Sequence, residues 1–431
     1  MSLYDELNVK ELLWKLQRVE TTLEAFSAYS KYAVSFQDLK VVVSLDDFAA
    51  HKSFGKFETI AKIENVIPYY RSHQLLVLNN ETVRAAKRDE LANFVVDHTL
   101  MFDTNVASAI STMFRGRGLR NNHDRVIKLL DSVVYNEYNF DHLFYMQESI
   151  KFVRVISENW VGGAGGFWKK LNKGFRWNLA ALMCFRKIEC GEYVKHSKVS
   201  FECSFRQAVK EARNASYNYY VSGEGRDAAR KVVLMQRDIL LLLLVALRIN
   251  FSTERNIEDR TKLLLDEVQS IVGVFHEREI SILLSYFVDP KSVPILGTIN
   301  KGGKNRRLLK KVDNIAWDFY TPRAMEMAIN HFSTGQIILP YLATFDKNLE
   351  QLVGMFPVKG TILSVKDGLH LPFRSEKQVS YFEELGVAEI VAEFFTDQKI
   401  QERSRNRSQT IEEQFIKIKT EYEKFRSVMR A

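Results

Sequence analysis

The stretch "HTLMFDTNVASAI" (His98–Ile110) places an aspartate directly after a short apolar run and before small residues with helical spacing. The run Thr99–Phe102 is typical of a buried strand, so Asp103 stands where that strand ends. An aspartate at this place is an ordinary N-cap of the helix that follows. Ligands of open α/β sheets, however, also bind beyond the carboxyl ends of the strands. The rest of the chain has to decide between a cap and a site.

A second stretch, "GQIILPYLATFDKNL" (Gly335–Leu349), repeats this design, with Asp346 just beyond an apolar, strand-like run. If the two strands are neighbours, Asp103 and Asp346 face the same crevice. Two carboxylates held close together repel each other, so they normally bind a divalent cation or share a proton. Because carboxylates are hard oxygen ligands, Mg²⁺ or Mn²⁺ is the expected ion.

The two stretches carry a resemblance to a known family. "FDTN" after an apolar strand resembles the opening motif of PIN-domain ribonucleases, and "ATFDKNL" is similar to their late motif. The resemblance implies an α/β core with a parallel sheet flanked by helices. It also implies a third carboxylate between the two motifs, for which Asp318 in "NIAWDF" is favoured and Asp313 stays open.

The family pattern further implies a helical acid, which "FHEREISILLSYF" (Phe275–Phe287) supplies as Glu279 or, as the alternative, Glu277. The implied chemistry is hydrolysis of phosphodiester bonds assisted by Mg²⁺ or Mn²⁺. RNA is expected as substrate rather than DNA, and the habits of the family extend to toxins and antiphage defence effectors. Small polar residues near the acids are expected to orient a carboxylate or a water: Thr104, Asn105, Asn314 and Thr344.

Two basic segments lie close in sequence to the acids, and the chain has 61 Lys and Arg against 53 Asp and Glu. Both segments are hypotheses for phosphate binding, with a solvated loop as the simpler interpretation. "KGGKNRRLLKK" supplies Lys301, Lys304, Arg306, Arg307, Lys310 and Lys311, and "FRGRGLRNNHDR" supplies Arg115, Arg117 and Arg120.

The chain of 431 residues is long enough for more than one domain. We expect a mainly helical N-terminal segment over 1–95 and a PIN-like core over 96–350. That core would carry a large helical insertion at about 110–275, with one helical segment near 137–159, and Pro322 would kink or end a later helix. A hairpin over Thr361–Phe373 with an Asp-Gly turn, and helices of which the last is long and exposed, would occupy 351–431. The run Ile239–Ile249 is too short for a membrane span, and three cysteines without a paired motif favour a reducing cytoplasm.

Other interpretations compete with a nuclease. Arg117 and His123 have the R-x₅-H spacing of HEPN ribonucleases, but this spacing is common by chance. His98 with His123-Asp124 is similar to the HD phosphohydrolase pattern, but that architecture is all-helical, whereas His98 begins a strand-like run. The rival from another class is a noncatalytic, helix-rich module that binds nucleic acid or protein and keeps a degenerate PIN-like core. A regulatory protein partner also stays open.

Overall fold

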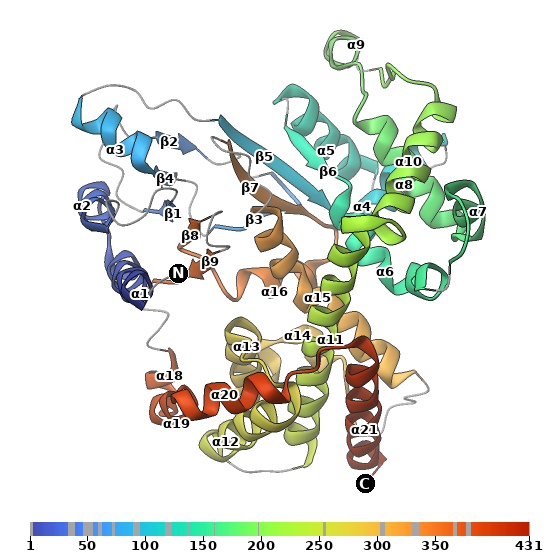
Figure 1. Ribbon diagram of the computed structural model, residues 1–431. Helices are drawn as coiled ribbons and strands as arrows, with labels where there is room; N and C mark the ends of the chain where they lie inside the picture. The colour runs from blue at the N-terminus through green and yellow to red at the C-terminus, as the bar shows by residue number, and fades with distance from the viewer. Residues whose placement is uncertain are drawn as a thin grey trace.

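The chain has a mixed α/β architecture, mainly helical, with two small sheets (Figure 1). The computed structural model describes residues 3–32, 39–45, 55–58, 63–70, 74–88, 95–116, 123–136, 138–158, 160–196, 198–252, 256–301, 307–329, 336–364, 369–375 and 381–430.

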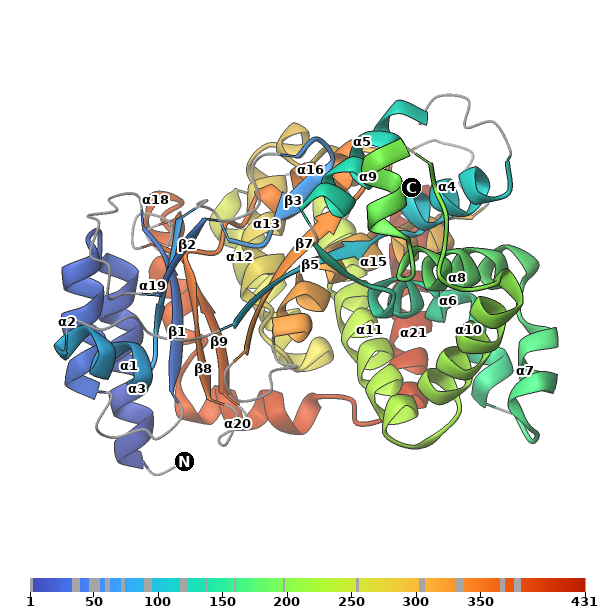
Figure 2. The ribbon, with the colours of Figure 1, turned by 90° about the horizontal axis from the view of Figure 1, so that it is seen from above.

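The first sheet is antiparallel and joins the two ends of the chain. Its strands lie in the order β2-β4-β1-β8-β9, with the bounds β1 (Lys40–Ser44), β2 (Gly55–Glu58), β4 (Gln74–Leu78), β8 (Gly360–Ser364) and β9 (Leu369–Phe373). The β-branched run Val41–Val43 forms β1, as its composition predicts. One face of the sheet is covered by α1 (Leu3–Arg18), α2 (Thr22–Tyr32) and α3 (Asn80–Lys87), as Figure 2 shows.

This sheet corrects the expected organisation of the chain. Residues 1–95 hold strands as well as helices, and the predicted hairpin of Thr361–Phe373 pairs with β1 instead of forming a separate C-terminal unit. The Asp-Gly turn expected between β8 and β9 lies outside the described residues. Leu16, Tyr29 and Val41 share a small hydrophobic core beneath the sheet.

The second sheet positions the candidate site. Its order is β3-β7-β5-β6, with the bounds β3 (Val66–Pro68), β5 (Val95–Phe102), β6 (Asn139–Asp141) and β7 (Gln336–Ala343). The central strand β5 runs parallel to both β6 and β7, with Leu100 opposite Phe140 and Tyr341. The two strand-like runs that end before Asp103 and Asp346 are therefore neighbouring parallel strands, and their carboxyl ends meet at one edge. Because β3 pairs antiparallel with β7, the sheet is mixed and not the parallel sheet that the resemblance implies.

The segment between β5 and β7 is almost wholly helical, as expected, apart from β6. Its helices are α4 (Thr104–Phe114), α5 (His123–Tyr135), α6 (Leu143–Glu158), α7 (Ala164–Lys170), α8 (Lys173–Phe185), α9 (Cys190–His196), α10 (Phe205–Tyr220), α11 (Gly223–Ser252), α12 (Ile257–Glu267), α13 (Glu277–Val288), α14 (Pro294–Gly297) and α15 (Leu308–Ile329), with a π-turn η2 (Val268–Val272) and a 3₁₀-turn η3 (Pro290–Ser292). The run Ile239–Leu247 of α11 is buried in the main core. Pro322, expected as a kink or boundary, lies inside α15.

The remaining helices are α16 (Lys347–Gly354), α18 (Tyr381–Glu384), α19 (Ala388–Glu393), α20 (Asp397–Asn406) and α21 (Ile411–Arg430). The helix α21 packs along α11, so the C-terminal residues close the main core rather than projecting from it as a long exposed helix. In the part of the chain that the structure describes, no helix combines the length and apolar character that crossing a bilayer requires.

Candidate functional site

Asp103 and Asp346 are both helix caps, and both stand at the carboxyl end of a parallel strand. Asp103 Oδ1 accepts a hydrogen bond of 2.7 Å from the Val106 amide and so caps α4. Asp346 Oδ1 accepts from the Asn348 amide at 2.9 Å and caps α16. The cap interpretation of the opening stretch is thus correct, and in both residues the cap uses only Oδ1.

Thr344 connects these two aspartates. Its hydroxyl donates a 2.6 Å hydrogen bond to Asp103 Oδ2 and accepts one of 3.0 Å from the Asp346 amide. The side chain is buried because β7 ends at Ala343 and the chain turns there toward α16. The residue expected to be a supporting polar group therefore orients the carboxylate of Asp103.

Glu148 is the third acid at this edge, and sequence reasoning missed it. It lies on α6 and accepts a 2.8 Å hydrogen bond from the Thr104 amide, one residue beyond Asp103. Its other oxygen is 3.4 Å from the ammonium of Lys151, one helical turn later. The sequence signal that was available is the break at "YNFDHL", where β6 ends and α6 begins, because residues 137–159 had been interpreted as one helix.

Asp318 completes the acidic cluster, which we define as Asp103, Glu148, Asp318 and Asp346. Burial together with the negative charges of Glu148, Asp346 and Asp103 raises the pKa of Asp318 to about 8, while the charge of Lys151 opposes the rise. No described residue donates a hydrogen bond to Asp318. A partly buried carboxyl without a donor is costly unless a proton or a cation neutralises it.

The same repulsion acts on Asp103. Burial and the charge of Glu148 raise its pKa to about 7, although the hydrogen bonds from Thr344 and the Val106 amide favour the ionised form. Two of the four acids thus retain protons near neutral pH when only protein surrounds them. Perturbed carboxyls of this kind gather at functional sites.

Glu279, expected to be the helical acid, belongs instead to a buried network of ion pairs. Both of its oxygens are bound by Arg323, at 3.1 and 2.8 Å, and its side chain is fully buried. Burial alone would raise the pKa of Glu279, but the charges of Arg323 and His276 lower it to about 2. The pair extends to Glu326, which Arg323 and Arg278 also bind. Glu279 therefore stabilises the packing of α13 on α15, and the structure does not bring it to the acidic cluster.

The two alternative acids also lie elsewhere. Glu277 is exposed and pairs with Arg374 at 2.8 Å. Asp313 Oδ1 accepts a 2.9 Å hydrogen bond from Gln236 of α11. Of the acids named from the sequence, the structure brings together Asp103, Asp318 and Asp346.

The remaining predicted polar groups lie near the cluster to different degrees. Thr104 Oγ1 is buried without a hydrogen-bond partner among the described residues, and Asn105 is exposed on the first turn of α4. Asn314 is exposed one helical turn before Asp318, on the same face of α15. Asn105 is therefore available to a bound molecule, whereas the Thr104 hydroxyl is not.

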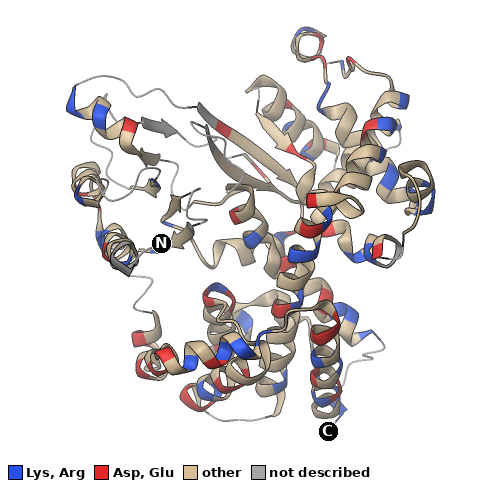
Figure 3. Cartoon of the chain, in the orientation of Figure 1, with Lys and Arg blue, Asp and Glu red and all other residues tan. Residues whose placement is uncertain are grey.

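The basic segments lie farther away. Lys301, Arg307 and Lys310 are exposed, and Lys311 donates to the Thr298 carbonyl. They stand at or before the start of α15, about 15 Å from Asp318 along the helix. Figure 3 shows Lys and Arg interspersed with Asp and Glu along most helices. Four of the predicted phosphate-binding residues lie outside the described residues: Lys304, Arg306, Arg117 and Arg120.

The acidic cluster fits a hard divalent cation in its chemistry. Within the described ranges, no three Asp, Glu, His or Cys side chains already lie in an arrangement that would hold a metal ion. The carboxyl of Asp318, however, has no donor from the described residues. Burial first, and nearby carboxylates second, raise the pKa values of Asp103 and Asp318, and a bound cation would favour the ionised form of both. All four side chains supply oxygen, as Mg²⁺ and Mn²⁺ prefer.

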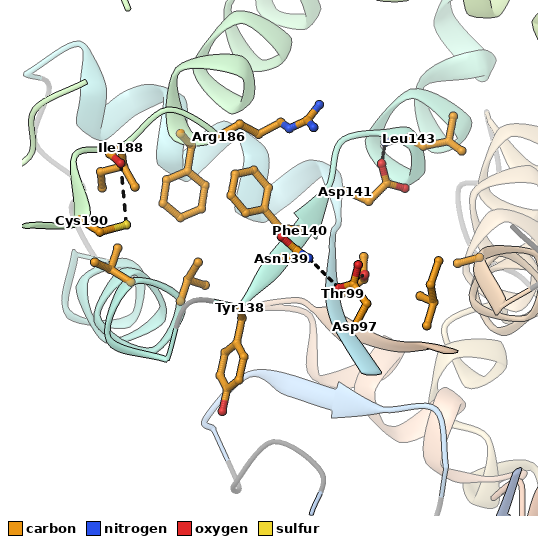
Figure 4. A pocket seen from close by; sticks show the side chains of 15 residues that line it. Asp97, Thr99, Tyr138, Asn139, Phe140, Asp141, Leu143, Arg186, Ile188 and Cys190 are labelled. Carbon is orange, nitrogen blue, oxygen red and sulfur yellow. Dashed lines mark hydrogen bonds between the residues drawn. The ribbon is translucent and has the colours of Figure 1, made fainter. Parts of the chain in front are cut away.

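Two hollows lie near this sheet. One, of about 540 Å³, adjoins the cluster and is lined by Asn105, Ser108, Ala109, Thr112, Phe345, Asp346 and Lys347. The other, of about 710 Å³, lies beside the edge strand β6 and has an apolar floor that includes Phe140 and Phe185. Figure 4 shows Asn139 donating to Asp97 in this second hollow, while the guanidinium of Arg186 points away. The Asp97 end of this hollow lies about 20 Å of strand before Asp103, whereas its Asp141 end lies opposite Met101, near the end of β5.

Comparison of the chain with protein-family models, with curated proteins and with solved structures finds no match.

Proposed function

We propose that this protein is a divalent-metal-dependent nuclease built on a PIN-like core, and that its substrate is RNA rather than DNA. The observation that carries the proposal is the acidic cluster at the carboxyl ends of β5 and β7. The parallel order β6-β5-β7, with one acid directly after β5 and one after β7, supports it. So does Glu148, which takes the place of the helical acid that the resemblance implies.

Each acid has a role in this proposal. Asp103, Glu148, Asp318 and Asp346 would hold Mg²⁺ or Mn²⁺, which, when bound, lowers the pKa of a water and neutralises phosphate charge. Thr344 orients Asp103, and the Thr104 amide orients Glu148. The exposed side-chain amide of Asn105 would donate to a phosphate oxygen.

One observation favours the rival, a noncatalytic binding module. The ammonium of Lys151 already lies 3.4 Å from Glu148 and acts electrostatically on Asp318. A resident lysine offsets part of the negative charge without a metal, as in a cluster that serves only structure. In the nuclease, the ammonium of Lys151 would instead pair with a phosphate oxygen of the substrate.

The test is cleavage of RNA and of single-stranded DNA by the purified chain with Mg²⁺, with Mn²⁺ and with chelator. Asp103→Asn is the matched control, because asparagine caps a helix as well as aspartate does, while it removes the charge and the oxygen that accepts from Thr344. We expect metal-dependent cleavage of RNA by the wild-type chain and none by the variant. Cleavage that survives Asp103→Asn would refute the assignment of the site, and no cleavage with either metal would favour the rival.

The same proposal covers a role as a toxin or antiphage effector held in check by a regulatory protein. Expression of the wild-type chain is then expected to arrest growth of a bacterial host, whereas Asp103→Asn is tolerated at equal protein level. Equal growth of the two strains would remove the toxin role but not the chemistry.

A further inference from the structure

A polar stripe runs along α4, away from the acidic cluster. Asn105, Ser108, Thr112 and Arg115 are three or four residues apart, so they lie on one face of the helix. The first three line the 540 Å³ hollow beside Asp346. The stripe therefore begins at the acids and ends at Arg115, about 15 Å farther along the helix axis.

Two stacked aromatic rings stand at the far end of this stripe. The guanidinium of Arg115 lies 5.5 Å from the ring centroid of Trp177 on α8. The Trp177 ring stacks on Phe205 of α10, with centroids 4.9 Å apart and an interplanar angle of 22°. Arg115 is held there because its Nε donates to the Ser111 carbonyl at 3.1 Å. We call Arg115, Trp177 and Phe205 the aromatic platform.

The platform is open to solvent and has basic neighbours. Phe205 is 39% exposed, and Trp177 is half-buried. Arg206 follows Phe205 and is exposed, while Arg176 precedes Trp177 and has a buried Nε without a hydrogen-bond partner among the described residues. Helices α4, α8 and α10 pack side by side, as Figures 1 and 2 show. Exposed rings beside arginines are the combination that binds unpaired bases and their phosphates.

We propose that the stripe and the aromatic platform form a track for single-stranded nucleic acid that leads into the acidic cluster. This inference rests on the proposed nuclease function and adds the form of the substrate: an unpaired base stacks on the exposed ring of Phe205, which Trp177 supports from its other side, and Arg115 holds a phosphate. At about 3.4 Å per stacked nucleotide, the stripe spans about four nucleotides. A base-paired duplex cannot use the platform, because its bases already stack on each other.

The test is binding of a fluorescently labelled, single-stranded oligoadenylate, as RNA and as DNA, measured by anisotropy in chelator so that nothing is cleaved. Trp177→Ala and Phe205→Ala are each expected to weaken binding about 5- to 30-fold. Arg115→Gln is expected to lower the slope of log affinity against log salt concentration by about one. Trp177→Phe keeps a ring and is expected to retain most of the affinity.

The matched control is Phe415→Ala, which removes a ring that is 56% exposed on α21, away from the platform. It should bind like the wild-type chain, and circular dichroism checks that all variants are folded. Equal affinity of the wild-type chain and both alanine variants, preferred binding of a duplex, or no binding of either oligonucleotide would overturn the track.

Failure of the track and failure of the nuclease give different results. Platform-dependent binding without metal-dependent cleavage would keep the track and refute the nuclease. Cleavage that Asp103→Asn abolishes, with unchanged rates in Trp177→Ala and Phe205→Ala below saturation, would keep the nuclease and refute the track.

Discussion

The Thr344 hydroxyl donates a 2.6 Å hydrogen bond to Asp103 Oδ2 across 241 residues of sequence. This hydrogen bond joins the residue that follows β7 to the acid that follows β5. Because the same hydroxyl accepts from the Asp346 amide, the geometry of two acids depends on one threonine.

Replacing Thr344 with valine keeps the shape of the side chain and removes these hydrogen bonds. We expect a loss of about 1.5–3 kcal/mol in the free energy of unfolding, as for a buried bond to an ionisable group. Equilibrium unfolding in urea measures it. Thr261→Val is the control, because the Thr261 hydroxyl bonds only to the Ile257 carbonyl of its own helix. Equal losses in the two variants would contradict a special role for Thr344.

The raised pKa values of Asp103 and Asp318 predict the pH dependence of stability in the metal-free protein. Their values of about 7 and about 8 lie above the ordinary value of aspartate in an unfolded chain, so the folded state binds more protons. Stability from these groups is therefore full at about pH 4 and is lost as the pH rises to about 8. The thermal midpoint should fall over this window.

Asp318→Asn tests this directly, since the amide cannot ionise. It should raise the free energy of unfolding at pH 8 by about 1–3 kcal/mol and leave it nearly unchanged at pH 4. An equal effect at both values of pH would show that Asp318 is not under repulsion in the folded protein.

A bound cation should offset the loss of stability that the ionised acids cause at pH 8. At pH 8, Mn²⁺ or Mg²⁺ at a hundred times its dissociation constant should add about 2.7 kcal/mol to the stability of the wild-type chain. Thermal unfolding with and without metal measures the gain. Asp103→Asn and Asp346→Asn keep their helix caps and should lose most of it, and an equal gain in these variants would place the metal elsewhere.

The sequence predicts a site residue only where a local pattern, such as an apolar strand just before it, marks that residue. Asp103 and Asp346 were found because each directly follows an apolar strand, a local pattern. Asp318 was found from its order relative to them. Glu148 was missed since the three-residue strand β6 before it is too short to interrupt a helical pattern. Glu279 was chosen wrongly for this group because its partner, Arg323, lies 44 residues away, and no local pattern reveals that ion pair.

The two sheets show the same limit for the fold. The strands β1, β5 and β7 and the hairpin strands β8 and β9 could be predicted from their apolar, β-branched runs. The pairing of β1 with β8 could not, because it joins residues more than 300 positions apart and leaves no signal in either strand alone.

Glu148→Gln and Glu279→Gln together decide which glutamate acts at the site. Glu148→Gln keeps an oxygen for the Thr104 amide, so we expect a change in stability of less than about 0.5 kcal/mol with loss of metal-dependent cleavage. Glu279→Gln leaves Arg323 buried without its counter-charge and should lower the free energy of unfolding by about 3–5 kcal/mol.

Because the pKa of Glu279 is lowered to about 2, its stabilisation is present above the ordinary pKa of glutamate and is lost as the pH falls toward 2. The two variants should therefore differ most in stability at neutral pH and converge in strong acid. Full cleavage by Glu148→Gln, or loss of cleavage by a folded Glu279→Gln at permissive temperature, would exchange the two roles.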